Sequence, residues 1–230
     1  MTAPATMQSE AMRWGHLPRA GRAARMTELA ELAAPEHTAI VTQECQGAVI
    51  GPNAGLAALA EEARRVALPN ITRLLPAARA AGVRVVHCLV QRRPDGLGSN
   101  HNAKIFAIGR GEVDIAPGTS GAAVLPELGP EPTDLVLSRW HGVGPMGGTD
   151  LDAVLRNLEV STIVVVGVSL NIAIPNVVMD AVNAGYRVVL PKDAVAGIPA
   201  EYGAAMIANT LSLLAAITTT DDLLQLWKRP

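Results

Sequence analysis

Apolar runs recur along the chain and alternate with amphipathic segments. The segment 162–168 is apolar almost throughout and rich in valine, which is typical of a strand covered on both faces. Four further runs resemble it, so the predicted strands are 38–42, 83–90, 134–138, 162–168 and 187–190. Leu151, Val154 and Leu158 lie at helical spacing. Comparable patterns predict helices over 56–66, 71–81, 149–158, 175–185, 200–217 and 221–227.

The order of these elements predicts the fold. Strands that alternate with helices form βαβ units, which build parallel sheets through right-handed crossovers. We therefore expect a three-layer α/β/α domain around a mostly parallel, Rossmann-like sheet of five to six strands. Ligands of such sheets bind beyond the carboxyl ends of the strands. This rule selects the candidate site, namely residues 44–46, 90–92, 139–141 and 169–176.

Two segments lie outside the repeating pattern. Residues 1–36 show no clear period until Thr27 and predict an N-terminal arm that ends in a short helix, with the main domain spanning 37–230. Residues 92–132 are rich in glycine, proline and asparagine and predict a long irregular excursion. A loop of that length in a compact domain usually serves function or assembly.

Composition excludes several classes of protein. The chain of 230 residues is 49% hydrophobic and 17% charged, which supports a large core. Its formal net charge is −2 and it contains no basic block, so nucleic-acid binding through phosphate contacts is disfavoured. The two cysteines form no metal-binding motif, and no metal or cofactor is expected.

The expected location is the cytoplasm. The first residues contain no apolar segment typical of a secretory signal, and no apolar run is long enough to span a membrane. Two thiols in a chain of this size indicate a reduced protein. The expected partners are a small-molecule substrate and further copies of the chain in a dimer or tetramer, with no nucleic acid and no membrane.

Four segments resemble the isochorismatase-like, or cysteine hydrolase, superfamily. Residues 38–46 look like its first strand, which ends in Asp-x-Gln, and residues 137–151 look like the stretch that carries the family lysine. Residues 167–174 are similar to the motif Gly-x-x-Thr-Asn-x-Cys-Val, and residues 180–194 resemble its closing signature. Together they span about residues 37–227. The resemblance implies the α/β fold and a hydrolase acting on a small metabolite.

The catalytic triad implied by this resemblance is altered at every position. Glu44 stands at the aspartate position, Arg139 at the lysine position and Ala173 at the cysteine position. Ala173 offers no nucleophile, so only its backbone can contribute. Arg139 stays protonated and can hold a carboxylate, whereas Glu44 can act as an acid or a base. Gln46 matches the family glutamine.

Three residues are expected to contact substrate: Gln46, His141 and Asn171. One branch of the family cleaves a vinyl ether by protonation and water attack, so hydrolysis without a thiol has a precedent. The pattern predicts such a hydrolase of an anionic metabolite, with Glu44 as acid or base and Arg139 as anion clamp. Two alternatives stay open, a catalytically silent ligand-binding protein and an assembly scaffold.

Several of the candidate residues also have a purely structural interpretation. Glu44 and Arg139 can form a structural ion pair without any catalytic role. Cys45 should point to the opposite face of the sheet from Glu44 and pack there. Cys88 should lie in the core, with an alternative role as nucleophile. His87 is expected to be a hydrogen-bonded strand residue rather than a catalyst.

Overall fold

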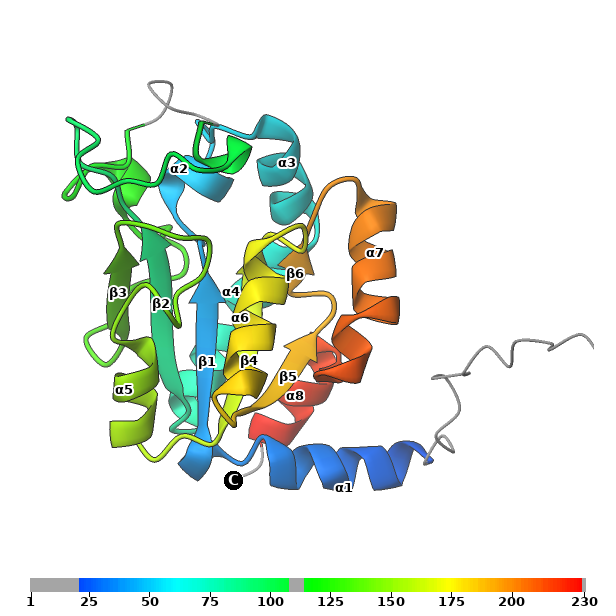
Figure 1. Ribbon diagram of the computed structural model, residues 1–230. Helices are drawn as coiled ribbons and strands as arrows, with labels where there is room; N and C mark the ends of the chain where they lie inside the picture. Colours follow the sequence, from blue (N-terminus) through cyan, green and yellow to red (C-terminus); the bar gives the residue numbers. More distant parts are fainter. Residues whose placement is uncertain (1–20, 108–113, 229–230) are drawn as a thin grey trace, which may run out of the picture.

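A seven-stranded parallel sheet forms the centre of the molecule (Figure 1). The computed structural model describes residues 21–107 and 114–228. The strand order is β3-β2-β1-β4-β5-β7, and a short β6 pairs with β4. The strands are β1 (Thr38–Gln43), β2 (Arg84–Val90), β3 (Leu135–Arg139), β4 (Thr162–Val168), β5 (Arg187–Pro191), β6 (Val195–Ala196) and β7 (Ala216–Thr218). The five predicted strands are confirmed.

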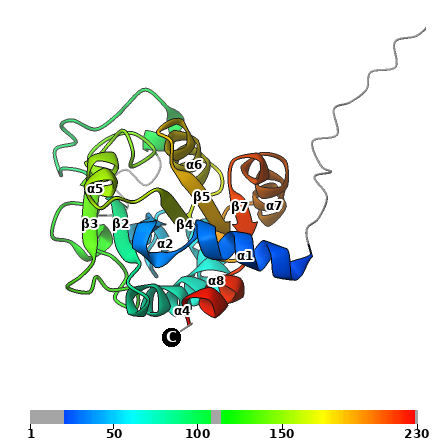
Figure 2. The same cartoon turned by 90° about the horizontal axis from the view of Figure 1, so that it is seen from below.

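Helices cover both faces of this sheet, as predicted (Figure 2). On one face lie α5 (Leu151–Asn157) and α6 (Ala173–Asn183), and on the other lie α4 (Ala67–Ala80) and α8 (Thr220–Trp227). The remaining helices are α1 (Arg22–Leu32), α2 (Gly47–Ile50), α3 (Ala57–Arg65) and α7 (Ala200–Asn209). In Figure 1, α2 and α3 lie beyond the carboxyl ends of the strands, where the excursion also runs.

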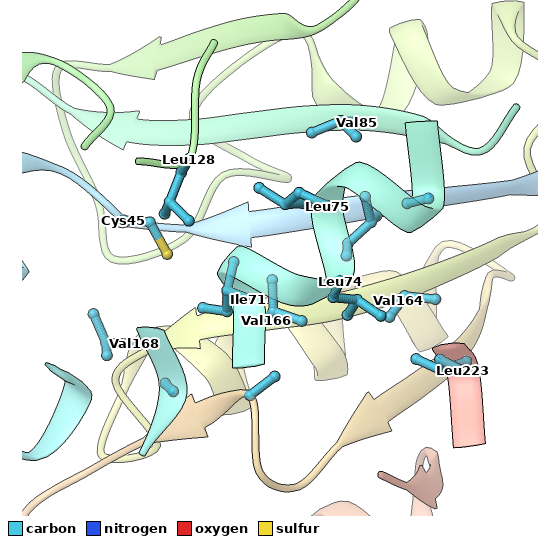
Figure 3. Packing of buried hydrophobic residues seen from close by; sticks show 14 of the residues in the cluster. Cys45, Ile71, Leu74, Leu75, Val85, Leu128, Val164, Val166, Val168 and Leu223 are labelled. Atoms are coloured by element: carbon cyan, nitrogen blue, oxygen red, sulfur yellow. The ribbon is translucent and has the colours of Figure 1, made fainter. Parts of the chain in front are cut away.

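The alternation of side chains along each strand produces two hydrophobic cores. In β1, Ile40 belongs to the core beneath α4, whereas Ala39 and Val41 belong to the core beneath α6. Figure 3 shows the first core, where Leu74 and Leu75 of α4 pack over the sheet. Because both faces of the sheet are buried in hydrophobic cores, the register of the strands is fixed, and so is the position of each strand end.

The predicted helix over 200–217 is wrong in its second half. Helix α7 ends at Asn209, a short 3-10 turn follows, and residues Ala216–Thr218 form β7 against β5. The apolar pattern alone could not distinguish one continuous helix from a helix followed by a turn and a strand. The free edge of β5 supplies hydrogen-bond partners that a helix would not use, and the β-branched Ile217 and Thr218 suit a strand. The sheet therefore has more strands than the five to six predicted.

The second part of the predicted arm belongs to the core. Leu29 of α1 and Ala33 are buried in the same cluster as Trp227 of α8. The indole N–H of Trp227 donates to the Ala33 carbonyl over 3.0 Å. Residues 1–20 of the predicted arm lie outside the described residues. In the described ranges no helix is long and apolar enough to cross a membrane.

Candidate active site

The three positions expected to correspond to the family triad line one cavity at the carboxyl ends of the strands. Glu44 follows β1, Arg139 ends β3 and Ala173 begins α6, and all of them line a cavity of about 180 Å³. The position at this edge of the sheet was predicted from topology alone. The geometry places these side chains together although up to 129 residues separate them (173 − 44).

Glu44 has an unusual backbone. Its φ angle is +54°, in the left-handed region, and its N–H donates to the Cys88 carbonyl over 2.9 Å. A non-glycine residue in that region costs of order 1–3 kcal/mol, and such residues concentrate at functional sites. Its Oε1 accepts hydrogen bonds from Arg139 Nη2 and from Gln43 Nε2. Within the described ranges Oε2 has no hydrogen-bond partner.

Arg139 is almost fully buried, with 3% of its side chain exposed. Its Nη2 pairs with Glu44, and its Nε donates to the Gly142 carbonyl over 3.3 Å. Its Nη1 is buried and finds no partner among the described residues. A buried guanidinium N–H without an acceptor is costly, and Arg139, which also lines the cavity, keeps this one donor unused.

Ala173 contributes a backbone donor in place of a side-chain nucleophile. It is the first residue of α6, and this helix has no side-chain cap. The described residues offer no backbone acceptor to its N–H, whereas Ile172 and Ile174 both donate to the Ser169 carbonyl. The first N–H groups of a helix favour negative charge. This end of the cavity can therefore stabilise an anion but cannot form an acyl-enzyme at Ala173.

The three expected substrate contacts do not line the cavity. Gln46 is fully buried, and its amide is bonded to both the N–H and the carbonyl of Val90 and to the Gly121 carbonyl. Asn171 bonds the backbone of Ile198 with both amide atoms, over 2.5 and 2.9 Å. His141 is exposed. Gln46 and Asn171 thus fix loops around the site.

Sequence reasoning missed Gln43. This residue is fully buried, and its Nε2 donates to Glu44 Oε1 over 3.2 Å, so it helps to orient that carboxylate. An amide side chain at the end of a strand that is predicted to be buried was the available signal. Arg92 and Ser169 also line the cavity, and both lie in segments that the strand-end rule selected.

Both thiols are buried and protonated. Cys45 packs in the core beneath α4, and burial raises its pKa to about 12, helped by the charge of Glu44. Burial likewise raises the pKa of Cys88 to about 12, against the lowering influence of Arg139. Cys88 is fully buried and does not line the cavity. The packing interpretation of both cysteines is confirmed, and the geometry gives Cys88 no path to a substrate.

His87 is a hydrogen-bonded strand residue, as expected. Its Nδ1 lies 2.8 Å from Thr42 Oγ1 and its Nε2 lies 3.2 Å from Asp134 Oδ2, which Arg79 also binds. Burial lowers the pKa of His87 more than Asp134 raises it. Among the described residues, no three histidines, cysteines or carboxylates are grouped so as to hold a metal ion.

The family model of the isochorismatase domain matches residues 38–222. The chain belongs to the isochorismatase family. It is 26% identical over 203 residues to the ureidoacrylate amidohydrolase RutB of Rhizobium rhizogenes, covering 82% of each chain. The RutB of Agrobacterium fabrum is also 26% identical, over 82% of this chain and 89% of that protein.

Solved structures of this family share the fold. A cysteine hydrolase from Pseudomonas syringae aligns with a TM-score of 0.73 and 24% identity, over 84% of this chain and 93% of that one. An N-carbamoylsarcosine amidase from Thermoplasma acidophilum aligns with a TM-score of 0.58 and 23% identity, over 80% and 96%. The three-layer architecture and the parallel sheet of this isochorismatase-family chain are thus those of known hydrolases.

Proposed function

We propose that this chain hydrolyses a small anionic metabolite without a cysteine nucleophile. One observation carries the proposal: among the described residues, Glu44 Oε2 and Arg139 Nη1 have no hydrogen-bond partner, although the two side chains pair with each other and both residues line the cavity. A purely structural ion pair would be expected to satisfy its buried atoms. The relatives named as amidohydrolase and amidase support hydrolysis of an amide or ureide bond.

The proposed chemistry uses water as the nucleophile. Glu44, held by Arg139 and Gln43 through Oε1, keeps Oε2 for a water molecule and takes a proton from it as the water attacks the scissile carbon. The same carboxyl group then returns the proton to the leaving group. The N–H of Ala173 and the start of α6 stabilise the negative charge that develops on the substrate oxygen.

In this proposal Arg139 binds the substrate anion with its unused donor. Arg92, a second cationic residue, also lines the cavity. A hydrogen bond to a charged group contributes about 1.5–3 kcal/mol, or roughly tenfold to a hundredfold in affinity. We therefore expect carboxylates to bind in preference to the matching amides.

Ligand binding without turnover is the second candidate. The methyl group of Ala173 and the pairing of Glu44 with Arg139 both favour it, because each removes a reactive group from the family triad. This candidate shares the cavity and the anion preference with the first. It differs only in the fate of the bound molecule.

Turnover assays on purified protein separate the two candidates. Isochorismate, ureidoacrylate, N-carbamoylsarcosine and related small amides and ureides form the panel. We expect hydrolysis of at least one compound, and a loss of about a hundredfold or more in Glu44→Gln, assayed at a temperature at which circular dichroism shows this variant to be folded, because it leaves the buried Arg139 without its counter-charge. Glu127→Gln, an exposed carboxylate outside the cavity, is the matched control. Binding without any turnover across the panel would favour the second candidate.

Calorimetric titration of a matched acid and amide tests the anion clamp. Wild type should bind the acid about tenfold to a hundredfold more tightly. Arg139→Lys should weaken binding of the acid, because an ammonium group cannot bond Glu44, Gly142 and a ligand in the same geometry. Equal affinities for acid and amide in wild type would end the anion-clamp proposal.

A further inference from the structure

The same cavity has a second, apolar side. Its polar lining comes from the strand ends and the segments that follow them, whereas much of its apolar lining comes from segments that lie beyond them, namely α2, α3 and the excursion (Figure 1). The apolar residues contributed by those segments are Ala48, Val49, Leu56, Leu59, Ile105, Phe106 and Ile115.

The apolar wall of the cavity differs from ordinary protein surface in its composition and in its burial. Aromatic residues make up 3% of the chain, and its single phenylalanine, Phe106, lines the cavity. Leu59 and Ile115 are buried yet still face the cavity. Because apolar side chains are stabilised when apolar surface covers them, a ligand with an apolar body would gain affinity here.

The size of the cavity limits that body. Its volume of about 180 Å³ is close to that of an engineered cavity of about 150 Å³ lined by Leu, Ile and Phe, which binds benzene. A short acyl chain or one small ring fits such a space. Glu44, Arg139 and Arg92 line the same cavity and supply its charged groups.

We propose that the preferred substrates are amides or ureides that carry one carboxylate and a short alkyl or aryl body, rather than ones whose body is polar throughout. This inference rests on the proposed function, since Arg139 must hold the carboxylate while α2, α3 and the excursion cover the apolar body. It adds a substrate class that the names of the relatives do not give. Ureidoacrylate and N-carbamoylsarcosine are both polar beyond their carboxylate.

Calorimetric titration with straight-chain acids from acetate to hexanoate tests the inference on the full-length chain. Each added methylene should tighten binding about fourfold until the cavity is full. Pentanoate should bind more tightly than 3-ureidopropionate, which has a similar length and a polar body. A dissociation constant that stays flat along the series, or tighter binding of the ureido acid, would overturn the inference.

Two variants locate the effect. Leu56 precedes α3 at the N-cap position, where asparagine is favoured, so Leu56→Asn should fold and should weaken hexanoate binding about tenfold while leaving acetate within about twofold. Val49→Thr, nearly the same in volume, is the second variant and should act in the same direction. Leu97→Asn changes an exposed leucine outside the cavity and is the matched control. Equal weakening of acetate and hexanoate in both cavity variants would count against an apolar subsite.

The amide comparison keeps this inference separate from the function on which it rests. If hexanoate and hexanamide bind equally while affinity still rises with chain length, the anion clamp fails and the apolar subsite alone remains. If acid is preferred over amide but chain length has no effect, the proposed function stands and the substrate class is wrong.

Discussion

Glu44 carries a carboxyl group one methylene further from its backbone than the family aspartate would. The left-handed backbone at this residue changes the direction in which the longer side chain leaves the strand. Hydrogen bonds from Gln43 and Arg139 to Oε1 then hold the carboxylate in place. The change from aspartate to glutamate therefore cannot be judged from length alone, because backbone conformation and partners decide where the oxygen atoms lie.

Neither of the two cysteine thiols should react in the folded protein. Cys45 and Cys88 are fully buried, and burial raises the pKa of each to about 12, so the thiolate fraction near neutral pH is negligible. Iodoacetamide should leave both unmodified in native protein and label both in denaturant, as read by mass spectrometry. Any hydrolysis should survive the native treatment. Inactivation traced to Cys88 and prevented by substrate would contradict the thiol-free mechanism.

His87 should make stability sensitive to acid. Its pKa is lowered in the folded state by burial, so the unfolded chain binds a proton at a pH where the folded chain does not. The free energy of unfolding should therefore fall as the pH drops below 6.5, the ordinary pKa of histidine. Arg79 and His87 lower the pKa of the Asp134 carboxyl despite its burial, so protonation of Asp134 reduces stability only in stronger acid.

Urea titrations at about pH 7 and about pH 5 measure this effect. His87→Gln should be less stable than wild type at the higher pH but should lose less stability between the two. His141→Gln changes an exposed histidine and should lose as much as wild type. The prediction fails if His87→Gln and wild type lose the same free energy of unfolding on acidification.

Among the elements, the strands were the most predictable, because β-branched runs that are apolar on both faces have few alternatives. The run over residues 162–168 became β4 without adjustment. The ambiguous segment was 200–217, where helix, turn and strand share one apolar composition. What decided it was the open edge of β5, a tertiary feature that no local pattern contains.

The junction between β1 and β4 leaves no room for a side chain at Gly167. Its φ is +110°, and a Cβ there would lie 2.3 Å from the Gln43 carbonyl oxygen and 2.9 Å from Cys45 Sγ. Gly167→Ala should cost roughly 3 kcal/mol or more, since backbone strain adds to overpacking. Gly185 has a similar φ of +92° but open space around it, so Gly185→Ala should cost only about 1 kcal/mol. If chemical denaturation gave similar losses of unfolding free energy for the two variants, backbone strain without overpacking would account for the cost at Gly167.

For the whole molecule, topology predicted the site better than residue type did. The rule about strand ends placed Glu44, Arg139 and Ala173 at one cavity, because parallel strands share a carboxyl edge. It could not predict which residues cover that edge. Phe106 and Ile115 come from the irregular excursion, whose path depends on contacts such as the Gln46 amide bond to Gly121 rather than on any periodic pattern.

Assembly is the last property that belongs to the whole chain. Only Gly203 is buried in the apolar helix α7, and Leu213 beyond it is 57% exposed. Val136, on the edge strand β3, is 43% exposed. Apolar surface exposed in this way usually marks an interface, so we expect a dimer or tetramer.

Light scattering at micromolar concentrations should therefore give two or four times the 23.9 kDa mass of one chain. Leu213→Glu places a charge on the surface next to α7, and Val136→Glu places one on the edge strand β3. Because burying an unpaired charge opposes association, at least one of these variants should shift the mass towards that of a single chain. Lys192→Glu changes the charge of another exposed residue and is the control. A wild-type mass of one chain across this concentration range would contradict the prediction, whereas a multimer that resists both variants would place the interface elsewhere.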